Sequence, residues 1–301
     1  MFRRDLSDVR RLAGANTVGR GFVELVNPDG GLDAWLNYGF SGRECVIRAG
    51  EPGAAYPAGF ATVLKGTMEQ PEATLRTLTV RIRDRLGELD RPLLQTRFAG
   101  SNALPAGVEG VDDLKGRVKP RVYGSVLNVA PPLVNTSRLI YQVSDTALDG
   151  ITVYDQGVAL TAGAAYASQA DMETNAPSAG QVRAWLAGGM FRLGSTPAGQ
   201  VTCDAVRGAA VANRTPAQVL KQMALDIGIA SGDIASADVT ALDAAAGYDC
   251  GIWVDDERSA LEAMDAIAAS VGAWYGFDRL GVLRMAQLAA PGAAAFTLEP
   301  C

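Results

Sequence analysis

Apolar and polar positions divide the chain into two β-rich regions followed by a region of helical periodicity. Residues 21–99 and 119–207 carry short apolar runs and alternating positions between glycine- and proline-rich turns, a pattern typical of regularly spaced strands. After Gly208 the apolar spacing changes from about two to about 3.6 residues, which predicts helices. The sequence therefore predicts a mainly β fold with an α+β C-terminal part.

The first β domain, residues 21–99, is predicted from one clear alternation and several shorter runs. Leu78, Val80 and Ile82 alternate with polar residues, which predicts a strand with one buried face. Short strands separated by glycine and proline turns favour a small barrel or sandwich. Further strands are expected at 22–26, 35–40, 45–49 and 61–68.

Residues 119–207 are predicted to form a second small barrel or sandwich. Tyr123 and its odd-numbered neighbours share one face of the first expected strand, at 121–128. Pro131 and Pro132 cannot donate to a β-ladder, so they must end this strand or lie at an edge. Strands are also expected at 139–143, 151–154 and 199–207, whereas 162–176 and 181–186 fit short helices equally well.

Residues 208–301 are predicted to form a module of two helices and a β-hairpin. Thr215 and Pro216 begin a capping-box pattern, and Gly228 ends that helix. A second helix begins near the carboxylates at 255–257 and ends at Gly272. The hairpin is expected from strands at 274–277 and 282–288, joined by the turn at 278–281.

Two segments lie outside these domains. Residues 100–118 are rich in glycine, alanine and proline, which predicts a linker. Residues 1–20 form a basic N-terminal arm with apolar residues at helical spacing, which is either a solvated helix or a docking arm. The arginines of this arm that are candidate interface residues are Arg3, Arg4, Arg10 and Arg11.

Composition narrows the possible partners and the cellular location. At 301 residues the chain is long enough for two or three domains, and its net charge of −6 argues against sequence-specific nucleic-acid binding. No apolar run approaches the ~20 residues that span a bilayer, and the opening residues lack the apolar core of a signal peptide. A protein made and kept in the cytosol, without a membrane span, is expected.

Catalytic chemistry is not predicted. The chain has no histidine, which removes serine–histidine and cysteine–histidine catalysis and histidine-bound metals. Two carboxylate pairs remain as candidates, Asp112 with Asp113 and Asp255 with Asp256, but adjacent residues point to different faces. We therefore expect no enzyme, and a cell-wall-degrading enzyme stays the weakest alternative.

Several structural motifs, none of them catalytic, follow one another along the chain. The main motif runs Lys119-Pro120-x-x-Tyr123-Gly124-x-x-x-Asn128-Val129-x-Pro131, followed by residues 139–143 and 153–158. Further motifs lie at 86–92, 191–194, 259–274 and 278–281. In these motifs the chain resembles, over roughly residues 20–290, the tail-tip proteins, baseplate or hub, of long non-contractile-tailed bacteriophages and gene-transfer agents.

The resemblance implies a structural virion protein at the tail tip, assembled in the bacterial cytoplasm. Such a protein forms a ring around the DNA exit channel, as a trimeric hub or alternatively a hexamer. Its partners would be itself, the tail tube or distal tail ring, the tape measure, and a central fibre or receptor-binding protein. The implied interface residues are the arginines of the arm, which would dock on a neighbouring subunit, together with Lys119, Pro120, Tyr123, Pro131 and Pro132.

Two further interpretations stay open. The two β domains would alternatively bind a host glycan or protein, with Trp185, Trp253 and Trp274 as candidate contacts. The cysteines are interpreted first as buried or incidental thiols in a reducing cytoplasm, so no cofactor is expected. Some tail-tip relatives carry an iron–sulfur cluster, for which the only candidate ligands here are Cys45, Cys203, Cys250 and Cys301, although their spacing matches no cluster motif.

Overall fold

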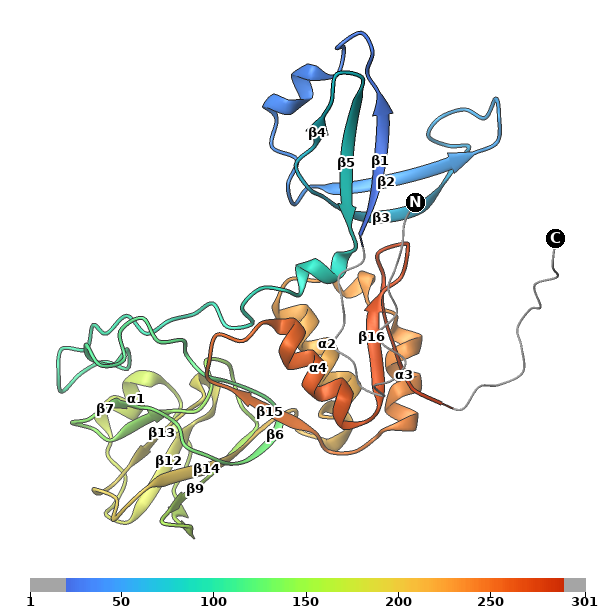
Figure 1. Cartoon of the computed structure of the whole chain (residues 1–301). Coiled ribbons are helices and arrows are strands. Elements are labelled where there is room, and N and C mark those ends of the chain that lie inside the picture. The colour runs from blue at the N-terminus through green and yellow to red at the C-terminus, as the bar shows by residue number, and fades with distance from the viewer. Residues whose placement is uncertain (1–19, 290–301) are drawn as a thin grey trace.

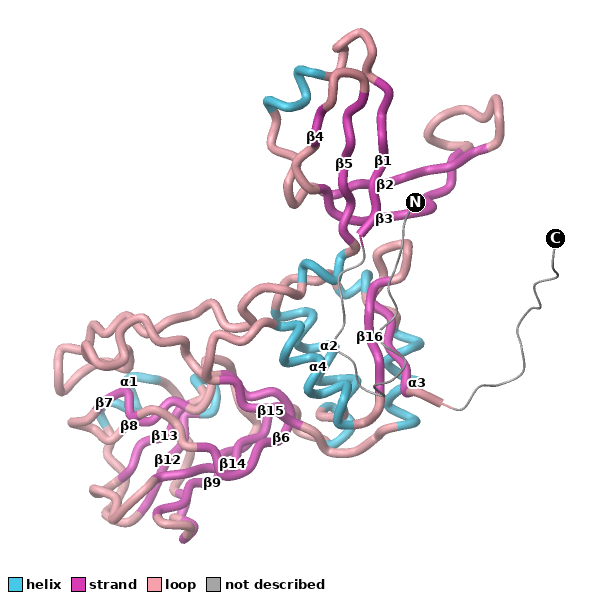
Figure 2. Tube along the Cα trace, viewed as in Figure 1, coloured by secondary structure: helices cyan, strands magenta, loops and turns pink. Residues whose placement is uncertain are grey.

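The computed structural model describes residues 20–289, which form a mainly β fold with four α-helices. Figure 1 shows three parts: a sheet of the first strands, a β-sandwich, and a group of helices with a hairpin between them. Figure 2 shows the long loop path that leaves the first sheet and reaches the sandwich. The predicted mainly β class with a helical C-terminal part is confirmed.

The first sheet has the strand order β1-β5-β3-β2, with β4 paired to β5. In Figure 1, β2 and β3 cross the direction of β1 and β5, so the sheet is strongly bent. It does not close into the predicted barrel within the described residues, because β1 and β2 are not paired with each other. The strands are β1 (Arg20–Val26), β2 (Glu44–Gly50), β3 (Phe60–Met68), β4 (Glu72–Ala73) and β5 (Thr77–Arg83).

The sequence patterns of this region predicted most of its strands correctly and one wrongly. Leu78, Val80 and Ile82 are buried, as their alternation predicts. The strand predicted at 35–40 is wrong, because this segment holds the short 3₁₀ helix η1 (Asp33–Asn37) with every side chain exposed. Its aromatic residues favour a strand by propensity, but among the described residues this segment pairs with no strand.

The second part is a sandwich of two five-stranded sheets. One sheet has the order β10-β9-β14-β6-β15 and the other β11-β12-β13-β8-β7. The first comprises β6 (Arg121–Val129), β9 (Gly150–Asp155), β10 (Val158–Ala159), β14 (Val201–Arg207) and β15 (Gly251–Val254). The second comprises β7 (Leu133–Asn135), β8 (Ile140–Gln142), β11 (Thr161–Ala162), β12 (Gln181–Trp185) and β13 (Met190–Leu193), with the short helix α1 (Gln169–Thr174) nearby.

The core of the sandwich takes side chains from both sheets. Val122 from β6, Cys203 from β14 and Phe191 from β13 are fully buried in one cluster. Pro131 and Pro132 follow the end of β6, as their missing amide donors require. The segment 100–118, predicted to be a linker, instead contributes Val108 and Leu114 to a smaller core against the second sheet.

The third part contains three helices rather than the predicted pair: α2 (Pro216–Asp226), α3 (Ser236–Ala245) and α4 (Ala260–Ser270). Helix α3 was missed because its sequence is mostly alanine and small polar residues, and only Val239 and Leu242 are buried. The caps follow the sequence, with Thr215 at the start of α2 and a Ser259–Glu262 capping box on α4. The predicted hairpin is confirmed as β16 (Ala273–Phe277) and β17 (Leu283–Gln287).

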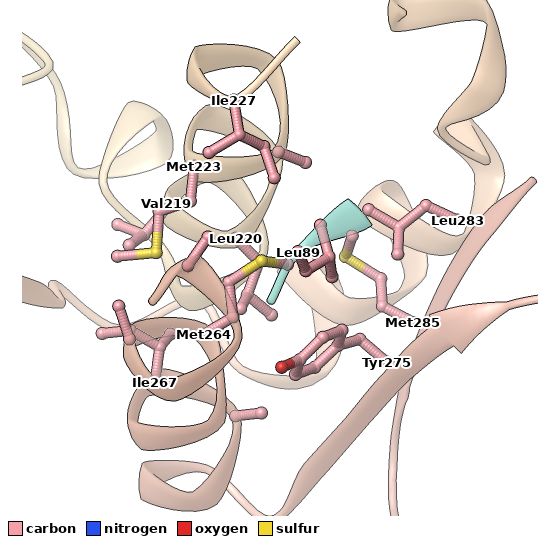
Figure 3. Close-up of a cluster of buried hydrophobic side chains, with 14 of the residues drawn as sticks. Leu89, Val219, Leu220, Met223, Ile227, Met264, Ile267, Tyr275, Leu283 and Met285 are labelled. Atoms are coloured by element: carbon pink, nitrogen blue, oxygen red, sulfur yellow. The ribbon is translucent and has the colours of Figure 1, made fainter. Parts of the chain in front are cut away.

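The core of this part lies among the helices and the hairpin. Figure 3 shows Leu220 of α2, Met264 of α4, and Tyr275 of β16 packed together with Leu89. Leu89 comes from the segment after β5 that was predicted to belong to the first β domain. The four leucines of that segment in this core are Leu86, Leu89, Leu93 and Leu94, so the module is larger than residues 208–301.

Strand β6 joins the sandwich to the helices. Val122 and Val126 on one face pack into the sandwich core, whereas Tyr123 on the other face packs into the helical core. Strand β15, from the C-terminal third of the chain, pairs antiparallel with β6, with Gly251 opposite Gly124. These two parts therefore share a sheet and are not separated by a linker.

Candidate interaction site

The first sheet presents two free edges. Within residues 20–289, β1 pairs only with β5 and β2 pairs only with β3. Each of these edge strands is seven residues long. Unpaired edge strands of this length expose backbone donors and acceptors that can form hydrogen bonds with another strand.

Few apolar side chains are buried in the first sheet and its loops. Leu78, Val80 and Ile82, all from β5, are the buried apolar side chains of residues 20–83. None of the three hydrophobic clusters of the described chain includes a residue from that range. A bent sheet of this size with one short buried stripe gains little from apolar burial by itself.

Large apolar side chains instead lie on the surface of the first sheet and its loops. This region holds eight of the sixteen exposed large apolar side chains of the described residues. A cleft of about 480 Å³ lies over β1 and β5, and its lining includes Phe22 and the Arg81–Glu72 ion pair. The exposed side chains are Phe22, Val26, Trp35, Leu36, Tyr38, Val46, Tyr56 and Leu75. An apolar concentration of this kind marks an interaction surface.

The predicted sites did not include this surface, although the sequence held one signal for it. Residues 22–26 read Phe-Val-Glu-Leu-Val, so apolar side chains fall on both faces of β1. A strand with one solvated face alternates apolar and polar residues, and β5 does so. The lack of alternation in β1 indicates that both of its faces meet other groups.

The predicted interface residues are placed differently by the structure. Arg3, Arg4, Arg10 and Arg11 lie outside the described residues. Lys119 forms an ion pair with Glu109 at 2.5 Å and lies over the ring of Phe98, so its charge is used within the chain. Tyr123, Pro120 and Pro131 are buried, while Pro132 is half-buried. The motif around Tyr123 is therefore mostly buried within the described chain, and its part in a subunit interface stays a prediction.

A network of ion pairs surrounds Tyr123. Arg121 donates to both carboxylate oxygens of Asp145, each at 2.6 Å, and to Asp226 of α2 at 3.2 Å. Arg207 of β14 donates to the same Asp226 at 3.1 Å and lies over the ring of Tyr123. Burial raises the pKa of the Tyr123 hydroxyl, so it stays neutral. This network fastens α2 to the sandwich.

The ionisation of Asp226 sets the acid sensitivity of this network. Burial alone would raise its pKa, but the charges of Arg207 and Arg121 and the hydrogen bond from Gln222 hold the pKa of Asp226 below its ordinary value. A carboxyl group whose folded pKa is lowered stabilises the fold above its unfolded pKa, near ~3.9, and loses that contribution as pH falls through the folded value.

We expect Asp226→Asn to be less stable than the wild type by a constant amount from neutral pH down to about pH 5, with the difference shrinking below about pH 4. Urea unfolding of both proteins over that pH range measures the difference. A gap that stays constant in the acid range would contradict the assignment of Asp226 as an ion-paired carboxylate.

The cysteines do not assemble into a cluster in the described chain. Cys45 lies in the first sheet, Cys203 in the sandwich and Cys250 beside β15, and all three are free thiols, while Cys301 lies outside the described residues. Burial raises the pKa of Cys203 to about 12, which disfavours the thiolate that a metal requires. No group of three potential metal-ligating side chains occurs within residues 20–289.

The other candidate residues are also dispersed. Trp185 and Trp253 are half-buried against cores, and the Trp253 indole donates to the carbonyl of Val143, whereas Trp274 is exposed on the hairpin. No ring contact among the described residues joins these tryptophans. In the carboxylate pairs, Asp112 and Asp113 are exposed on a loop, as is Asp255, and Asp256 is ion-paired with Arg258.

Comparison with known proteins assigns neither a family nor a function to this chain. Within residues 20–289, every helix is too short or too polar to cross a bilayer. No model of a known protein family matches this chain, and no curated protein matches it either.

Proposed function

We propose that this protein is a structural component of a phage tail tip that assembles into a ring through its first β-sheet. The observation that supports this most is the pair of free edges, β1 and β2, on a thinly packed sheet rich in exposed apolar side chains. Head-to-tail pairing of β1 from one copy with β2 of the next is a heterologous contact, and such contacts form rings when the rotation closes.

The position of the first sheet also supports this function. Figure 1 places it to one side of the helices, and among residues 20–289 no further strand pairs with the outer edges of β1 and β2. The sheet is fixed to the helical part, because Arg85 donates to Asp233 at 2.7 Å and to the Gly281 carbonyl at 2.6 Å. A ring built on these sheets would carry the sandwich as a peripheral domain for the neighbouring tail proteins named by the resemblance.

Light scattering coupled to size exclusion tests the proposal on the full chain and on a variant lacking residues 1–19, which keeps all of β1, at low and high salt. We expect a defined assembly of three or six times the 31.4 kDa chain mass for the full chain. Reduced assembly in the truncated variant would assign the basic arm to the same contact. A monomer under every condition would contradict self-assembly and favour the host-surface binding alternative.

A substitution on the sheet separates its role from folding. Phe22 is 51% exposed on β1, so Phe22→Lys leaves the buried stripe intact while placing a charge on the proposed contact. We expect this variant to be monomeric in light scattering with an unchanged circular dichroism spectrum. Val158→Lys is the matched control, because Val158 is 69% exposed on another edge strand, β10. If both variants assemble like the wild type, the first sheet is not the contact.

A further inference from the structure

A second cleft lies away from the first sheet, between α2 and the ends of β6 and β14. It has a volume of about 300 Å³, and its lining includes Tyr123, Arg207, Asn213, Lys221 and Gln222. Helix α2 presents one face to this cleft and the opposite face to the helical core. The cleft is therefore built from two parts of the fold that the ion-pair network around Asp226 holds together.

The lining of this cleft is positively charged. Arg207 and Lys221 are its two charged residues, and no carboxylate lines it. The Arg207 guanidinium donates a hydrogen bond to the Asp226 carboxylate at 3.1 Å, and its central carbon lies 5.2 Å from the centroid of the Tyr123 ring. These two contacts fix its position. Lys221 has no ion-pair partner among residues 20–289. A fixed guanidinium beside a free ammonium group is an arrangement suited to a negatively charged ligand.

Tyr123 lines the cleft, and the Arg207 guanidinium lies over its ring. Its hydroxyl is buried close to Arg121 and Asp226, which both influence its pKa. The hydroxyl therefore belongs to the ion-pair network, and the donors available to an anion in the cleft come from Arg207, Lys221 and Asn213.

We propose that this cleft binds a small oxyanion, a phosphate or carboxylate group, between Lys221 and Arg207. Lys221 supplies the unpaired positive charge, and Arg207 supplies oriented N–H donors that remain beside its bond to Asp226. The Asn213 amide, which also lines the cleft, adds a neutral donor. The site is independent of ring formation, because all of its residues come from one chain.

Isothermal titration of the full chain with inorganic phosphate, and separately with succinate, tests this site. We expect saturable binding of one anion per chain, and the tighter of the two anions identifies whether phosphate or carboxylate is the preferred group. Lys221→Gln should weaken binding about tenfold, since it removes a charge-assisted hydrogen bond.

Lys115→Gln is the matched control, since Lys115 is an exposed lysine on a distant loop and should bind the anions like the wild type. Thermal unfolding of each variant without the anion verifies folding, and a bound anion should raise the unfolding temperature of the wild type. The proposal is overturned if neither anion binds saturably, or if Lys221→Gln and Lys115→Gln bind equally well.

Discussion

Gly124→Ala is expected to destabilise the protein by more than about 4 kcal/mol, a loss that only severe internal clashes produce. A Cβ at this position would lie 1.9 Å from the Cys250 carbonyl oxygen, and the backbone has φ +69°. That oxygen accepts the hydrogen bond from the Ser125 amide at 3.0 Å, so relief of the clash would separate β15 from β6. Urea unfolding followed by circular dichroism measures the loss.

Gly116→Ala is the matched control for this prediction. Gly116 has a similar φ of +80°, but a Cβ there would meet no atom within 4 Å. The Gly116→Ala substitution should therefore lower the free energy of unfolding only by the left-handed backbone strain, about 1–2 kcal/mol. Equal losses in the two variants would show that close approach of β15 to β6 is not the reason for glycine at position 124.

Arg121→Met is expected to cost about 3–5 kcal/mol, because it leaves Asp145 buried without its partner. The Asp145 side chain is only 6% exposed, and both of its oxygens accept from Arg121. Asp226 would keep its bond to Arg207, so the loss should arise mainly from Asp145. Urea unfolding of the variant at neutral pH measures this loss.

Arg258→Met provides the comparison for an exposed ion pair. Arg258 contacts Asp256 at 2.7 Å, but the two side chains are 33% and 50% exposed, so the change should cost less than about 1 kcal/mol.

The double variant Arg121→Met with Asp145→Ala tests whether the loss of stability in Arg121→Met comes from the unpaired Asp145 carboxylate. If Arg121→Met is equally destabilising when Asp145 is absent, the unpaired carboxylate is not its cause.

The sequence predicted the elements whose signals are local. The alternation of β5, the Thr215 cap of α2 and the hairpin of β16 and β17 all depend on neighbours a few residues apart. These signals sufficed for the mainly β class and for most strand positions. They also predicted that the prolines after β6 would end that strand.

Long-range contacts were not predictable in the same way. A four-residue strand such as β15 has no periodicity that reveals its partner, and its pairing with β6 crosses more than a hundred residues of chain. The leucines after β5 are visibly apolar, but their pattern does not specify which core they enter. Packing of this kind depends on the three-dimensional arrangement of elements rather than on their sequence order.

The candidate sites were predictable only in part. The motif at Tyr123 was correctly predicted to hold a strand, but its resemblance to a family did not reveal that Tyr123 faces a core. The exposed apolar side chains of the first sheet are ordinary strand formers, so their exposure became apparent only from the open strand order. The cleft at Lys221 combines residues from β6, β14 and α2, a combination that sequence spacing cannot indicate.

The shared strand β6 also constrains how the chain folds during synthesis. The sandwich strands up to β14 are made first, but the edge of β6 stays uncovered until β15 has emerged from the ribosome. Pairings between distant segments form slowly, and an open edge is prone to pair with other chains in the meantime. The last third of the chain thus supplies the strand that completes a sheet begun much earlier.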